Sequence, residues 1–166
     1  MTTTPRTWIV GEVVSAAEMN AEIRDQFTDI LAPWISYTPV WGSTGTAPSI
    51  SNGSLAGRYK LVGKSCTAVF EQVMGSSTTF GSGTYSWSLP FTAANPGGTS
   101  ANFNWHGAAR GHGAAWYAGT VGVLKNGNIA RIYSHVAATE WSPTEPTTWT
   151  AANTRYLSGQ VQYEIA

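Results

Sequence analysis

The sequence contains few of the groups that most enzymes use. Of its 166 residues only 11% are charged, two are aspartates (Asp25 and Asp29) and one is a cysteine. Both aspartates lie in one short segment, whereas general acid–base catalysis usually needs paired carboxylates that face a cleft. We therefore expect a protein without enzymatic activity.

The lone cysteine, Cys66, cannot form a disulfide within the chain, so folding does not depend on oxidation. No apolar run approaches the roughly 20 residues that a membrane-spanning helix needs. The first residues, MTTTPRTW, lack the basic start and the apolar run of a signal peptide. We expect synthesis in the cytoplasm and no insertion into a membrane.

Basic residues are few and scattered, and the formal net charge is zero. The chain therefore lacks the concentrated positive charge with which proteins bind nucleic acids. His106, His112 and His135 are candidate metal ligands, but no cysteine or carboxylate spacing supports a metal site around them. We expect no metal and no other cofactor.

Glycine and tryptophan are abundant, with 18 and 8 residues, and 42% of the chain is hydrophobic. Together with the low charge, this composition predicts a globular chain with many turns and an unusually apolar or well-buried surface. Such a surface is typical of proteins that function in obligate assemblies.

One segment near the start predicts an amphipathic helix over residues 15–31. Ser15 and Glu18 have the spacing of a capping box, and Pro33 ends the helix. At 100° per residue an apolar stripe and an acidic strip lie on different sides. The stripe consists of Ala16, Met19, Ile23, Phe27, Ile30 and Leu31, and the strip of Glu18, Glu22, Asp25 and Asp29. No second amphipathic helix follows, so the partner of the stripe is an open question.

After Pro33 the sequence changes to short alternating runs separated by turn signals, which predicts an all-β domain. Residues 55–62 and 65–74 form a hairpin in this interpretation, and Asn126-Gly127 marks a tight two-residue turn. Tyr85, Trp87 and Leu89 alternate with serines and predict one buried strand face. The expected strands are 37–41, 55–62, 65–74, 85–89, 103–109, 114–124, 129–135 and 157–165. About eight antiparallel strands of this kind favour a jelly-roll β-sandwich preceded by the helix.

The helical segment has a recognisable pattern, which consists of Trp8, Gly11-Glu12, Val14-Ser15-Ala16, Met19-Asn20 and Ile23-Arg24-Asp25. This pattern resembles an N-terminal segment common in small virion structural proteins of tailed bacteriophages, among them minor tail and fibre proteins. Three later motifs are similar to the β domain often attached to that segment, a trimeric jelly roll of the tumour-necrosis-factor and complement type. They are GRYKLVGK (57–64), TTFGSGTYSWSLP (78–90) and GQVQYEIA (159–166).

The resemblance implies a homotrimer in the virion, with an anchor at residues 1–35 and a β domain at residues 36–166. The anchor would bind other virion proteins through Trp8, Met19, Asn20, Ile23, Phe27 and Leu31. Because the chain lacks a long fibrous shaft, a short fibre or spike, a baseplate component or a capsid decoration protein fits best. The helices could pack around a threefold axis, on the β domain or on a virion partner.

The alternative function is a receptor-binding or carbohydrate-binding tip that recognises a host surface glycan. Aromatic rings bind the apolar side of a sugar, and nearby cationic groups bind its polar groups. The candidate residues, chosen because they lie near predicted loops or strand ends, are Trp105, Arg110, His112, Trp116, Tyr117 and Trp141.

Overall fold

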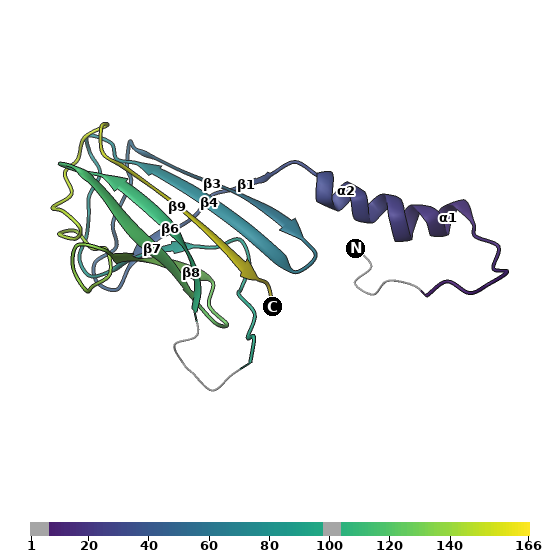
Figure 1. The fold of residues 1–166 in the computed structure, drawn as a ribbon. Coiled ribbons are helices and arrows are strands. Elements are labelled where there is room, and N and C mark those ends of the chain that lie inside the picture. The colour runs from purple at the N-terminus through teal and green to yellow at the C-terminus, as the bar shows by residue number, and fades with distance from the viewer. Residues whose placement is uncertain (1–6, 98–103) are drawn as a thin grey trace.

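The computed structural model describes residues 7–97 and 104–166, which form one N-terminal helix and nine β-strands (Figure 1). The helix comprises α1 (Ala16–Met19), the π-helical segment η1 (Asn20–Arg24) and α2 (Asp25–Leu31). The strands are β1 (Ile35–Tyr37), β2 (Trp41–Ser43), β3 (Ser54–Val62), β4 (Ser65–Val73), β5 (Tyr85–Ser88), β6 (Asn104–His112), β7 (Trp116–Leu124), β8 (Ile129–Ser134) and β9 (Tyr156–Glu164).

The helix begins and ends where the sequence predicts. The backbone N–H of Glu18 donates to Ser15 Oγ at 3.2 Å, and the N–H of Ser15 donates to Glu18 Oε2 at 2.8 Å, which completes the capping box. Ala32 has an extended ψ of 146°, because the residue before a proline is excluded from the helical region.

The middle of the helix differs from the prediction of a regular α-helix. In η1 the N–H of Asp25 bonds to the carbonyl of Asn20, five residues back. A π turn holds more residues than an α turn, so it interrupts a seven-residue repeat at this point. The helix therefore does not present an unbroken heptad pattern along its length.

The nine strands belong to one antiparallel sheet, in the order β1-β3-β4-β9-β6-β7-β8-β5-β2 across the described residues. The predicted hairpin is confirmed, since β3 and β4 pair along their whole length from Ser54↔Val73 to Val62↔Ser65. β6, β7 and β8 form a meander, and the C-terminal strand β9 lies between β4 and β6. The hydrogen-bonded ladder thus joins elements that are far apart in the sequence.

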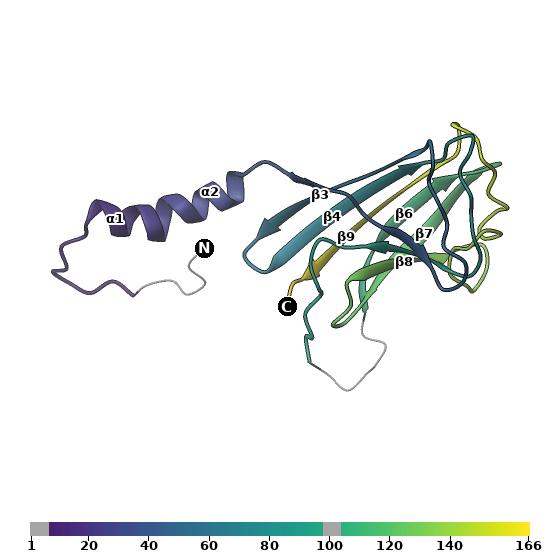
Figure 2. The ribbon, with the colours of Figure 1, turned by 180° about the vertical axis from the view of Figure 1, so that it is seen from behind.

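The sheet curls on itself like half a barrel, so that its two flanks face each other (Figures 1 and 2). The ring of Phe70 in β4 stacks on Trp87 in β5, with centroids 5.5 Å apart. A mainly β antiparallel fold with an N-terminal helix is therefore confirmed. The jelly-roll sandwich is not, because β7, β8 and β5 continue one ladder instead of separating two sheets.

The core lies inside the curl and is built by alternate residues of the strands. Tyr85, Trp87 and Leu89 are all buried, as their alternation predicts. The Trp87 Nε1–H donates to the Oε1 of the fully buried Gln72 at 2.8 Å, so a polar contact joins β4 to β5 inside the core. Gly107 allows β6 to approach β9 closely, since a Cβ there would collide with the backbone carbonyl of Gln160.

Three connections differ from the prediction. The expected strand 37–41 is two strands, β1 and β2, separated by residues that include Pro39, which cannot donate to a ladder. The turn between β6 and β7 lies at residues 113–115, not 110–113. Asn126 has a positive φ of 58° but Gly127 does not, so the two-residue hairpin turn is absent. The carbonyls of Gly127 and Asn128 accept instead from Ala93 and Leu89, after β5. Residue 103 of one predicted strand lies outside the described residues.

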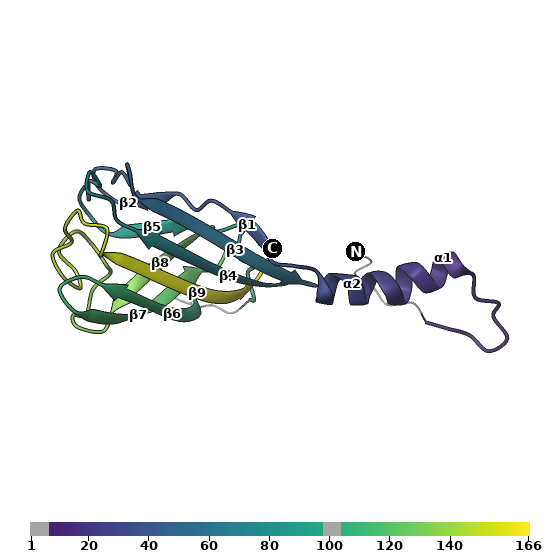
Figure 3. The same ribbon diagram turned by 90° about the horizontal axis from the view of Figure 1, so that it is seen from above.

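The helix extends away from the edge of the sheet (Figure 3). Its junction with the sheet is short: Lys60 Nζ donates to the carbonyl of Ala32, and the guanidinium of Arg58 lies 5.4 Å from the ring centroid of Trp34. No described helix is long and apolar enough to cross a membrane.

Candidate functional site

The helix carries an exposed apolar surface, which we call the helix stripe and define as Met19, Ile23, Phe27, Ile30 and Leu31. These side chains are 40–79% exposed, and no residue of α1, η1 or α2 is buried. An amphipathic helix normally buries its apolar side against a core. This helix does not do so within the described chain.

The segment before the helix also carries exposed apolar side chains. Trp8 is 41% exposed, and Ile9, Val10 and Val13 are 71–107% exposed. Residues 8–14 are a short apolar stretch in the sequence, but only Trp8 is among the predicted anchor residues, because the run lacks a helical or strand period. Gathered exposed apolar side chains commonly mark an interaction site.

The other predicted features of the segment lie as follows. Asn20, the predicted polar position of the anchor, is partly buried within η1. In the acidic strip, Glu18 caps the helix and Asp25 pairs with Arg24 at 2.7 Å. Glu22 and Asp29 are partly exposed on the same helix. The helix carries the four acidic residues of the strip and one basic residue, Arg24, so it favours a partner that is not itself acidic.

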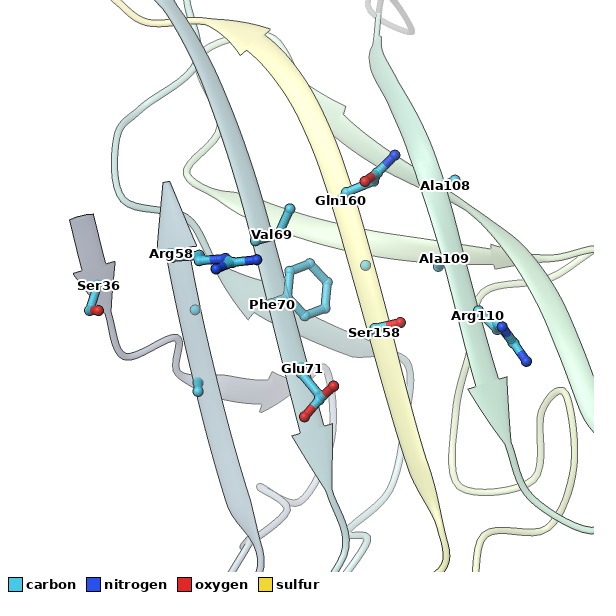
Figure 4. A pocket seen from close by; sticks show the side chains of 13 residues that line it. Ser36, Arg58, Val69, Phe70, Glu71, Ala108, Ala109, Arg110, Ser158 and Gln160 are labelled. Atoms are coloured by element: carbon cyan, nitrogen blue, oxygen red, sulfur yellow. The ribbon is translucent and has the colours of Figure 1, made fainter. Parts of the chain in front are cut away.

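A second surface is a shallow groove of about 610 Å³ on the outer face of β3, β4, β9 and β6 (Figure 4). We call it the outer groove. Two rows of outward-facing residues cross it, as the strand registers establish. One row is Arg58, Val69, Gln160 and Ala108, and the other is Ala56, Glu71, Ser158 and Arg110. The side chains of Ala56, Ser158 and Ala108 are small, so they do not fill the groove.

An arginine lies at each edge of the outer groove, with Glu71, Ser158 and Gln160 between them (Figure 4). The Arg110 guanidinium lies over the Trp116 ring at 3.6 Å from the centroid, and Arg58 lies near Trp34 at 5.4 Å. Both arginines are exposed. Contact with an indole restricts the guanidinium and still leaves it available to an anion.

Three of the predicted glycan-binding residues come together at the Arg110 edge: Arg110, His112 and Trp116. The His112 ring lies 4.6 Å from Trp116 and 5.5 Å from Tyr156, and its Nδ1 lies 3.0 Å from the carbonyl oxygen of Thr154. Tyr156 is a residue that sequence reasoning missed. It joins the cluster because β9 pairs with β6, a contact between distant segments that no local pattern reveals.

The other three candidates lie elsewhere. Trp105 lies at the far end of β6, beside a second depression that His106 and Gln162 also line. Tyr117 is partly buried and packs against the core. Trp141 is fully buried and contacts Trp149, with centroids 5.8 Å apart, so its ring is not available to a ligand.

The arrangement of the titratable groups was compared with the geometry that a metal ion requires. No group of three histidine, cysteine, aspartate or glutamate side chains with metal-binding geometry occurs among them. Burial raises the pKa of the Cys66 thiol, which disfavours the reactive thiolate. Glu140 pairs with Arg131 at 3.2 Å, so its carboxylate serves a structural contact.

Comparison with protein-family models, with curated proteins and with solved structures finds no match to this chain.

Proposed function

We propose that this protein is a non-enzymatic structural component of a bacteriophage or phage-like particle, attached to it through residues 1–35. The observation that carries the proposal is the helix stripe. It is an apolar surface that no described part of the chain covers, and it lies on a helix that extends away from the sheet. The β domain of residues 36–166 would be the part that the attached helix presents.

Helix stability supports the need for a partner. The helix from Ala16 to Leu31 is about 24 Å long at 1.5 Å per residue. Isolated helices of this length are marginal in water and gain most of their stability from packing of an apolar face. Since the sheet does not cover that face, a partner protein that does would stabilise the helix and hold the β domain in place.

The kind of assembly is proposed from the resemblance of the helical segment to those of tailed-bacteriophage structural proteins. A homotrimeric short fibre or spike, a baseplate component or a capsid decoration protein fits the length of the chain. We retain the jelly roll as part of this proposal, because the two flanks of the curled sheet face each other through Phe70 and Trp87 as two sheets of a sandwich would.

Attachment is tested with a variant of the helix stripe, Phe27→Ser together with Ile30→Ser. Particles from the source of the gene are purified on a density gradient, and the protein in the particle fraction is measured by mass spectrometry. We expect the wild-type chain in the particles and at least a tenfold loss for the variant, as burial of two large apolar side chains contributes several kcal/mol and tenfold requires only about 1.4 kcal/mol. The matched control, Ala17→Ser with Thr28→Ser, changes exposed helix positions outside the stripe and should attach normally.

Two results would contradict the proposal: no wild-type protein in the particles, or equal attachment of the stripe variant. The trimer is tested separately by light scattering at micromolar concentration. A mass three times the 17.7 kDa of one chain supports it, and the mass of one chain rules it out.

The second candidate function is a receptor-binding or carbohydrate-binding tip. The specific observation that favours it is the pair of exposed arginines, each held against an indole at an edge of the outer groove. This function is compatible with attachment through the helix, because the two surfaces share no residue.

A further inference from the structure

We propose that the outer groove binds a saccharide that carries carboxylate groups. The inference deepens the carbohydrate-binding candidate above and rests on it, and it does not depend on attachment through the helix stripe. A volume of about 610 Å³ lies within the range of ligand sites, and the groove is open enough for an extended chain.

The two arginines provide the anion-binding groups. Arg58 is in β3 and Arg110 in β6, which are separated by three inter-strand steps, or about 14 Å at ~4.8 Å per step. Neither guanidinium has a carboxylate within salt-bridge distance among residues 7–97 and 104–166. A planar guanidinium already ordered on an indole binds a carboxylate with little further loss of side-chain entropy.

The floor of the groove suits the hydroxyl groups of a sugar. Glu71 is exposed between the arginines and lies in the same cross-strand row as Ser158 and Arg110. Its carboxylate can accept hydrogen bonds from two neighbouring hydroxyls, and the Ser158 hydroxyl and the Gln160 amide can both donate and accept. Ala56 and Ala108 lie at opposite ends of the two cross-strand rows, and their small side chains leave room for a ring beside these polar groups.

The same arrangement disfavours a uniformly charged polyanion. A chain with a phosphate at every unit would bring negative charge against Glu71, and the net charge of this protein is zero. A carboxylated saccharide alternates anionic groups with hydroxyl donors, and so matches both the arginines and the glutamate. The acidic helix of a second copy is a poorer fit, because its apolar stripe would meet a floor of mostly polar and small side chains.

The experiment uses the full chain on an array of oligosaccharides that carry uronate or sialate groups, each beside its methyl ester. The ester keeps the hydroxyls and removes the charge. We expect binding of at least one acidic saccharide, at least tenfold weaker binding of its ester, and about tenfold weaker binding by Arg58→Gln and by Arg110→Gln in calorimetry with that saccharide. Glu71→Gln should weaken acid and ester alike. Arg24→Gln, a matched change on the exposed helix, should leave affinity unchanged.

An array without any acidic binder at millimolar concentration overturns the proposal. So does binding that the Arg24 control weakens as much as the groove variants do, or binding to the ester as tight as to the acid. A synthetic peptide of residues 15–31 is titrated in parallel, and its tight binding in the groove would assign the groove to a second copy of the chain. The particle assay with the helix-stripe variant is unaffected by these results, so the two proposals fail separately.

Discussion

Removal of the N-terminal segment should leave the sheet folded. A chain that starts at Ser36 loses the whole helix and the first residue of β1, Ile35, which pairs with Tyr59. It also loses two contacts at the junction: the Lys60 hydrogen bond to Ala32 and the Arg58 contact with Trp34. The hydrogen bond contributes about 1 kcal/mol and an exposed cation–π contact about 0.5–1 kcal/mol. Since no helix residue is buried, the expected loss in the free energy of unfolding is about 1–2 kcal/mol.

Urea denaturation followed by tryptophan fluorescence measures this loss, since Trp41, Trp87, Trp141 and Trp149 are all buried in the core. A second chain that starts at Trp34 keeps the contact with Arg58, so its loss in the free energy of unfolding should be about half as large. A loss above about 4 kcal/mol, or a broad transition that indicates a disrupted core, would refute the idea that the helix is peripheral to the fold.

Three further predictions concern the sheet. Gln72→Leu leaves the buried Trp87 N–H without its acceptor and should lower the free energy of unfolding by about 1–3 kcal/mol. Trp87→Phe removes the donor, so the double variant should lose less free energy of unfolding than the sum of the losses of the two single variants. Gly107→Ala should separate β6 from β9 and sharply lower the yield of folded protein, whereas Ala108→Ser on the exposed face should not. Burial raises the pKa of Tyr37 to about 12, above the value of 10 for an unfolded chain, so this phenol should lower stability progressively from pH 10 to 12 in urea melts, after the fall from about pH 9 that the raised pKa of the Cys66 thiol predicts. Stability that rises over this range would contradict the burial of both groups.

Local chemistry explains what the sequence predicts well. Ser15, Glu18 and Pro33 define the ends of the helix because each acts on neighbouring backbone. The β3–β4 hairpin likewise depends on adjacent residues, with Gly63 at a positive φ of 58° in the turn. The alternation from Tyr85 to Leu89 reports burial directly, since one side of a strand faces the core.

The single curled sheet was not predictable in the same way. It depends on β9, the last strand, pairing with β4 and β6, and on β5 pairing with β8. These contacts join distant segments, and a sandwich and a curled sheet have the same alternation along each strand. The prediction of a two-sheet sandwich is therefore compatible with the pattern but not required by it.

In the candidate site, too, neighbouring residues were predictable from the sequence and contacts between distant segments were not. The sequence placed Arg110, His112 and Trp116 together because they lie near one turn, and the structure brings them into contact. It included Trp141, whose burial depends on how a long loop folds over the sheet end. It missed Arg58, because the opposite edge of the groove comes from a strand some 50 residues earlier.

Hydrogen–deuterium exchange at the amides of residues 16–31 tests the central claim, that the helix is an attachment device. In the free protein at sub-micromolar concentration these amides should exchange far faster than those of β4, β6 and β9, because packing does not protect the helix. In gradient-purified particles the same amides should become strongly protected while exchange in the β domain stays nearly constant. Strong protection in the dilute free protein, or none in the particle, would contradict the claim.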